Sequence, residues 1–103
     1  MTVNPALEEF ERYRAELSDA CRAHPKIVGL VLFGSSADRS RVDQWSDHDF
    51  AVICEARVQE ALRGDLSWLP RYGSLAFAAR EHHDGFKAVY RSGAVIEFAV
   101  VDH

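Results

Sequence analysis

The sequence predicts an α/β (α+β) domain in which helices pack on one mixed β-sheet. Two observations lead to this expectation: apolar residues recur at helical spacing near the start of the chain, and short β-rich runs bounded by turn residues follow. The expected order is helix, strand, helix, strand, helix and then an antiparallel meander. With 103 residues, of which 48% are hydrophobic, the chain can bury one core, so we expect a single domain over residues 1–103.

The first two expected elements are an amphipathic helix and a buried strand. Asn4 followed by Pro5 is a typical helix start, and apolar positions then repeat at helical spacing: Leu7, Phe10, Leu17 and Cys21. Pro25 ends this helix, because proline disfavours helical geometry in the residue before it. Residues 27–33 are apolar on both faces, which predicts a central strand.

The middle of the chain predicts a turn, a second strand and further helices. Gly34 ends the first strand, and residues 37–42 are expected to form a short helix. Residues 47–54 form the second predicted strand. Apolar residues over 58–66 predict a helix that ends near Pro70 and covers one face of the sheet.

The last third predicts an antiparallel meander of three strands. The strands are expected over 74–81, 86–90 and 94–101, with turns at 82–85 and 91–93. The sequence given stops just after the last strand, so we expect one flank of the sheet to lack a covering element. A downstream helical domain, a protein partner or a second copy in a homodimer would fit there. In the first case the chain is the N-terminal part of a longer protein.

Three carboxylates lie within apolar strand sequences, where an unpaired charge is costly: Asp47, Asp49 and Glu97. Asp47 and Asp49 are two positions apart, so on a strand they project to the same face. Such a pair can bind magnesium, and Glu97 would join it if its strand neighbours theirs. The alternatives are that Asp47 merely starts the strand, that Asp49 pairs with Arg39 or Arg41, and that Glu97 faces solvent from an edge strand.

Other polar residues near this motif have a functional and a structural interpretation. Gly34 and Ser35 follow a strand, where they can cradle a phosphate or form an ordinary turn. His48 points away from the aspartates, which favours a packed core histidine. Residues 82–84 favour a hairpin turn over a metal site, and Trp45 favours a loop anchor over a base-stacking residue.

Taken together, these motifs resemble the DNA polymerase β-like nucleotidyltransferases. The match consists of Leu-Phe-Gly-Ser at 32–35, Asp-His-Asp-Phe at 47–50 and the apolar-flanked Glu97. The stretch at 43–49 is most similar to small-molecule adenylyltransferases of the aminoglycoside and lincosamide type. The resemblance covers about residues 27–102.

The resemblance implies transfer of a nucleoside monophosphate from a nucleoside triphosphate to a hydroxyl of a small-molecule acceptor. The similarity to the adenylyltransferases implies that the triphosphate is ATP. Pyrophosphate is released with the help of two Mg²⁺ ions. Asp47 and Asp49 would hold the metals, and Gly34 and Ser35 the β- and γ-phosphates. Glu97 would either ligate the acceptor-side metal or take the acceptor's proton. The alternative is a nucleotidyltransferase-like antitoxin or regulatory module that acts with or on a protein partner.

Composition excludes several other classes. The net charge of −4 and the absence of a basic track disfavour an extended nucleic-acid substrate. Cys21 and Cys54 lie far apart without ligand-like spacing, so we expect neither a disulfide framework nor a zinc site. The apolar run over 27–33 is too short to cross a membrane and no secretory segment opens the chain, so we expect a cytoplasmic protein.

Overall fold

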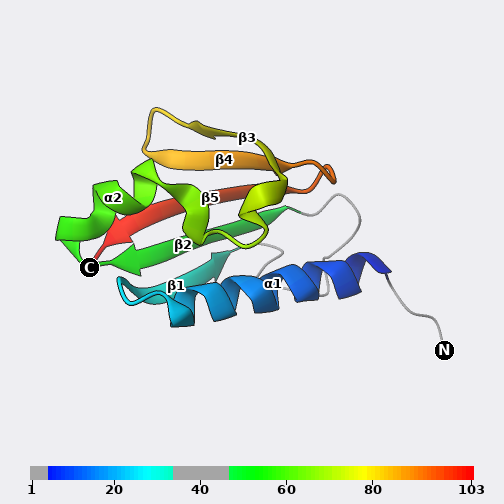
Figure 1. Cartoon of the computed structure of the whole chain (residues 1–103), viewed down its shortest axis with the longest axis horizontal. Helices are drawn as coiled ribbons and strands as arrows, with labels where there is room; N and C mark the ends of the chain where they lie inside the picture. The colour runs from blue at the N-terminus through cyan, green and yellow to red at the C-terminus, as the bar shows by residue number, and fades with distance from the viewer. Residues whose placement is uncertain (1–4, 34–46) are drawn as a thin grey trace.

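The computed structural model describes residues 5–33 and 47–103, which form one five-stranded sheet with helices against it (Figure 1). The elements are α1 (Pro5–Ala23), β1 (Ile27–Phe33), β2 (His48–Cys54), the 3-10 turn η3 (Ala56–Val58), α2 (Gln59–Gly64), the 3-10 turns η4 (Leu66–Trp68) and η5 (Tyr72–Ser74), β3 (Leu75–Arg80), β4 (Gly85–Tyr90) and β5 (Val95–Asp102). Within this described part, no helix is long and apolar enough to span a membrane.

The sheet is mixed, as predicted, with the strand order β1-β2-β5-β4-β3. β2 and β5 pair in parallel, and the other three pairs of neighbouring strands are antiparallel. The predicted meander over the last third is confirmed, with β3, β4 and β5 joined by turns. The parallel pair brings the starts of β2 and β5 to the same end of the sheet.

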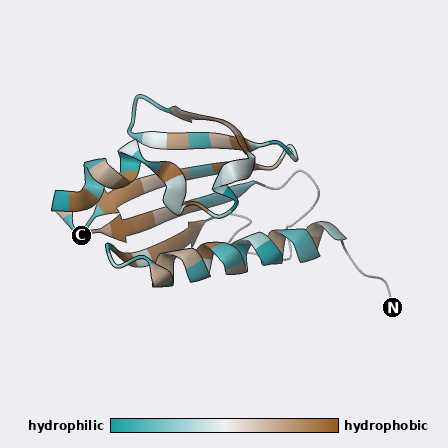
Figure 2. Cartoon of the chain, in the orientation of Figure 1, coloured by the Kyte–Doolittle hydropathy of each residue, from teal (hydrophilic) through white to brown (hydrophobic). Residues whose placement is uncertain are grey.

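The core lies on one face of the sheet. Leu17 of α1 and Leu62 of α2 belong to the same buried cluster as Phe50, Val52 and the inward residues of β5, so both helices cover this face. Figure 2 shows the alternation of hydrophilic and hydrophobic residues along α1 that an amphipathic helix requires. Cys21 and Cys54 are buried in this cluster.

The helix boundaries agree with the sequence at the start of the chain and differ after β2. α1 ends at Ala23, close to Pro25, as predicted. The single helix predicted up to Pro70 is wrong, because Asp65 adopts an extended backbone conformation that separates α2 from η4. The Asp65 carboxylate accepts a hydrogen bond from the Ser67 amide (3.0 Å), and the Trp68 indole donates to the Leu62 carbonyl (2.9 Å). The short helix predicted over 37–42 lies outside the described residues.

The prediction of β1 as a central strand is wrong, because β1 forms an edge of the sheet. Leu30 and Leu32 pack against the core, whereas Val28 and Phe33 are 58% and 50% exposed. The exposed side chains are as apolar as the buried ones, so the sequence pattern of this strand does not reveal that one of its faces is uncovered.

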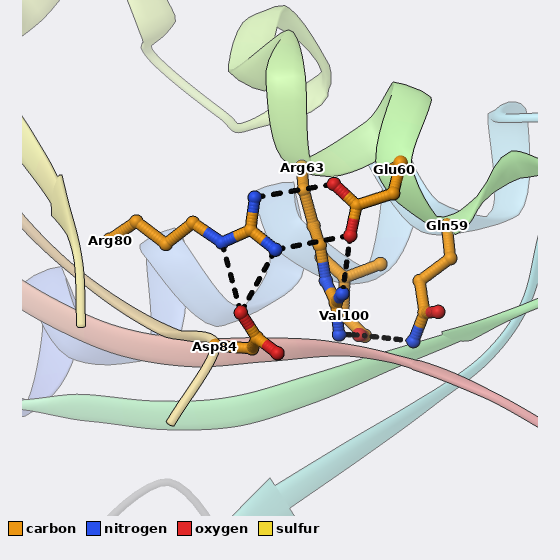
Figure 3. Close-up of polar contacts among 6 residues, drawn as sticks. All are labelled: Gln59, Glu60, Arg63, Arg80, Asp84 and Val100. Atoms are coloured by element: carbon orange, nitrogen blue, oxygen red, sulfur yellow. Dashed lines mark hydrogen bonds and ion pairs between the residues drawn. The ribbon is translucent and has the colours of Figure 1, made fainter. Parts of the chain in front are cut away.

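Side chains of α2 cover the overhanging end of β5. β4 pairs with β5 only up to the Gly85–Ala99 pair, so β5 continues beyond this neighbour. In this overhang the Val100 carbonyl accepts hydrogen bonds from Gln59 Nε2 (3.1 Å) and Arg63 Nη2 (2.9 Å) (Figure 3). Glu60 binds both Arg63 and Arg80, and Arg80 also binds Asp84 in the β3–β4 turn: a network that ties α2 to the sheet.

Replacing Arg63 with methionine should destabilise the fold. The Arg63→Met change keeps the aliphatic stem but removes one donor to the part-buried Val100 carbonyl, so we expect a loss of about 1–2 kcal/mol. Urea denaturation measures it. Arg57→Met is the matched control, because Arg57 pairs with exposed Glu55 at the surface and its loss should change stability by less than about 0.5 kcal/mol. Equal effects of the two changes would contradict a specific role for the Arg63 contact.

Candidate active site

Two of the predicted carboxylates lie side by side on neighbouring strands. Asp49 of β2 and Glu97 of β5 are register partners in the parallel pair, and Asp47 directly precedes β2. The expectation that the strand of Glu97 neighbours that of the aspartates is therefore confirmed. The alternative that Glu97 lies on an edge strand is wrong, because β5 lies between β2 and β4. The Glu97 side chain is nevertheless 47% exposed.

Strand alternation places these carboxylates on the face of the sheet away from the helices. His48 and Phe50, which flank Asp49, are buried beneath α1 and in the core, and Ile96 and Phe98 flank Glu97 in the same way. Adjacent residues of a strand project to opposite faces, so burying these neighbours leaves both acids on the open face. The packing of the core thus determines where the acids point.

The acids belong to a row that crosses the whole sheet. Register partners on consecutive strands are Phe33, Asp49, Glu97, Lys87 and Ala79, and we call these five residues the acidic row. Lys87 Nζ lies 3.6 Å from Glu97 Oε1, and both side chains are about half exposed. An exposed pair of this kind is weak, on the order of 0–1 kcal/mol, so a ligand can readily displace it.

The electrostatics of the row favour a cation. The pKa of the Asp49 carboxyl is raised, first by partial burial and then by the negative charges of Glu97 and Asp47. Among residues 5–33 and 47–103, no group of three or more histidine, cysteine, aspartate or glutamate side chains forms a ready-made metal site. Magnesium commonly uses one or two carboxylates and completes its shell with water and phosphate oxygens, so adjacent hard oxygen ligands with an excess of negative charge suit it.

The remaining candidates divide into those the structure describes and those it does not. His48 is a buried core histidine, as predicted, and burial lowers its pKa to about 4. Residues 82–84 form the predicted turn, in which Asp84 has a positive φ of 61° and binds Arg80. Gly34 and Ser35 lie outside the described residues, as do Arg39, Arg41 and Trp45.

Lys87 is a neighbour of Glu97 that was not predicted from the sequence. The signal was present in the β4–β5 hairpin, because the turn predicted at 91–93 fixes an antiparallel register that pairs Lys87 with Glu97. Reading the hairpin register from its turn would have found this contact.

No protein-family model matches the chain, and no curated protein matches it in sequence. Its structure nevertheless has the nucleotidyltransferase fold, which confirms the predicted fold class. The chain is similar in structure to the Cid1 poly(U) polymerase solved with Mg²⁺ and 3′-dATP bound. The two structures match with a TM-score of 0.59 and a sequence identity of 21%. The match covers 90% of this chain and 31% of the polymerase chain, so the chain spans less than a third of that protein.

Neutralising Asp49 should stabilise the fold at neutral pH. The raised pKa means that the folded state disfavours the ionised carboxyl, so Asp49→Asn should increase the free energy of unfolding at pH 7, by only a small amount because solvent screens this partly exposed group. The gain should shrink as the pH falls and vanish below the ordinary value of 3.8, where the native aspartate is itself protonated. Denaturation at several pH values measures this.

The control for this prediction is Asp84→Asn. Asparagine tolerates the positive φ of residue 84, but the change removes an ion pair with Arg80, so stability should stay equal or fall slightly at pH 7. A loss of stability in Asp49→Asn at pH 7 would show that the acidic row is not under electrostatic strain.

Proposed function

We propose that the protein is a magnesium-dependent nucleotidyltransferase that moves a nucleoside monophosphate from a nucleoside triphosphate to an acceptor hydroxyl and releases pyrophosphate. The observation that carries this proposal is the pairing of Asp49 with Glu97 on the open face of a nucleotidyltransferase fold, with Asp47 directly before β2. The raised pKa of Asp49 supports it, because burial and then the nearby charges of Glu97 and Asp47 disfavour the ionised carboxyl, and a bound metal would favour it.

Within this proposal the aspartates and Glu97 have different tasks. Asp47 and Asp49 would together hold two metal ions, one of which would neutralise charge at the triphosphate while the other would lower the pKa of the acceptor hydroxyl. Glu97 lies one strand away and would complete the metal ligands on the acceptor side or take the acceptor's proton. Gly34 and Ser35 are proposed to bind the β- and γ-phosphates through backbone amides.

We further propose ATP as the donor and a small hydroxyl-bearing molecule as the acceptor. The net charge of −4 disfavours a long polyanionic acceptor. Beside the acidic row, the next row across the open face consists of Val31, Ala51, Ala99 and Gly85, a small apolar surface suited to an uncharged portion of an acceptor.

The second candidate function is a nucleotidyltransferase-like module that acts with or on a protein partner. It is favoured by the exposed apolar side chains of Val31, Phe33 and Val101 on the sheet. The two candidates differ in whether the chain alone binds nucleotide.

The proposal is tested by calorimetric titration of the chain with ATP, with and without Mg²⁺. We expect Mg²⁺-dependent binding that is lost in the Asp47→Asn/Asp49→Asn variant, because the metal loses both charged ligands. The matched control is Asp19→Asn/Asp84→Asn, which makes the same change in charge at an exposed helix position and at the β3–β4 turn. Its binding should equal that of the unaltered chain.

Two results would contradict the proposal. Failure of the folded, unaltered chain to bind any of the four common triphosphates would favour the partner-dependent module. Equal loss of binding in both double variants would show that overall charge, rather than the acidic row, controls nucleotide binding. If binding follows the prediction, pyrophosphate release with a panel of hydroxyl compounds identifies the acceptor.

A further inference from the structure

His48 occupies the position between the two aspartates, yet its ring lies on the other face of the sheet. It is 6% exposed and stacks on Phe10 of α1, with ring centroids 4.0 Å apart and an interplanar angle of 17°. The Tyr13 ring lies 4.5 Å away and is tilted by 37°. The ring is thus packed between one strand and two aromatic residues of α1.

Packing against aromatic side chains holds this ring in place. Among the described residues, His48 Nδ1 has no hydrogen-bond partner. Burial lowers the pKa of the imidazole to about 4, so the ring is neutral at pH 7. A buried polar atom without a partner costs about 1–3 kcal/mol, so the stack with Phe10 and Tyr13 must offset this penalty.

The part of α1 that holds His48 is itself anchored from two directions. The Tyr13 hydroxyl bonds the Tyr90 hydroxyl of β4 (2.8 Å), and the Tyr90 hydroxyl donates to the Pro70 carbonyl (2.7 Å). Arg71 pairs with Glu9 and Glu16 of α1, and its guanidinium lies 5.6 Å from the centre of the Tyr13 ring. α1 therefore cannot move away from the start of β2 without breaking these contacts.

This anchoring acts at the end of the sheet that carries the acids. His48 is the first residue of β2 and pairs with fully buried Ile96, and the next pair is Asp49–Glu97. The aromatic stack is thus a tertiary restraint on the residue that connects Asp47 to Asp49.

We propose that His48 is a positioning residue whose ring, packed against Phe10 and Tyr13 of α1, fixes Asp47 and Asp49 on the open face of the sheet. The consequence for metal binding rests on the proposed function, whereas the restraint on the strand does not. His48 itself does not touch substrate or metal, because its side chain lies on the helix-covered face.

The test compares His48→Ala, Phe10→Ala and His48→Phe with Val52→Ala as the control. His48→Ala and Phe10→Ala each remove one side of the stack, whereas His48→Phe keeps a flat ring. Val52 is fully buried on the same strand and face, farther from the acids, so Val52→Ala removes packing without touching the stack. Two readouts are needed: amide hydrogen exchange by residue, and the Mg²⁺ concentration that gives half-maximal ATP binding.

Hydrogen exchange tests the restraint without requiring function. His48→Ala and Phe10→Ala should speed exchange at the amides of 48–50 and 96–98 more than at 52–54, and His48→Phe should not. Val52→Ala should not give this local pattern. Uniform faster exchange in all the truncations would overturn the inference, because His48 would then be an ordinary core residue. If His48→Ala does not fold, Phe10→Ala and His48→Phe still decide the question.

The metal readout separates the inference from the proposed function. We expect His48→Ala and Phe10→Ala each to raise the Mg²⁺ concentration needed for half-maximal ATP binding about tenfold. The His48→Ala/Phe10→Ala double variant should be no worse than either single variant, because both changes remove the same stack. Unchanged Mg²⁺ dependence together with unchanged local exchange would overturn the inference and leave the proposed function intact. Local exchange as expected, with no Mg²⁺-dependent binding in the unaltered chain, would overturn the proposed function and leave the strand restraint established.

Discussion

The parallel pairing of β2 with β5 is the constraint on which the rest of the molecule depends. Parallel neighbours need a long crossover connection, and here that connection contains α2 and the β3–β4 hairpin. The pairing sets Asp49 beside Glu97, and one residue further along it sets Phe50 beside Phe98 on the opposite face. The Phe50 and Phe98 rings stack at 5.2 Å, and Phe86 stacks on Phe98 at 5.1 Å. One register therefore produces both the acidic row and the centre of the core.

The two faces of the sheet have opposite energetic roles. The helix-covered face gains from burial of aromatic and aliphatic side chains, including Phe50, Val52 and Leu17. The open face holds Asp49 in a place where the folded state disfavours its charge. Stability gained on one face offsets electrostatic strain on the other, a distribution typical of functional sites.

Sequence reasoning works here where the signal is local and fails where it depends on strand order. Strand alternation predicts the faces of Asp49 and Glu97, because Glu97 lies between apolar Ile96 and Phe98 and Asp49 precedes apolar Phe50. The sequence could name the adjacency of the two strands that carry these acids only as a condition for a shared site, since tertiary packing decides which strands are neighbours. The same limit explains β1: the apolar side chains of Val28 and Phe33 resemble those of a central strand, but no element covers them in the described structure.

The break after α2 has a different cause. The apolar spacing continues through Leu66, but the extended backbone of Asp65 and the hydrogen bond from Trp68 to the Leu62 carbonyl fold the segment back on the sheet.

Tyr13 was missed as a core residue because its hydroxyl needs a buried partner, and that partner, Tyr90, lies 77 positions away. Long-range polar contacts of this kind have no signature in a local pattern.

The charge on the open face limits how a triphosphate can approach. Under the proposed function, Asp47, Asp49 and Glu97 would repel the phosphates of the nucleotide, and Lys87 is held to Glu97 only by a weak, half-exposed ion pair. A divalent cation shared between carboxylate and phosphate oxygens would offset this repulsion. The acids that would repel a free triphosphate would then attract the metal–nucleotide complex, so the charges of the described site agree with the proposed magnesium dependence.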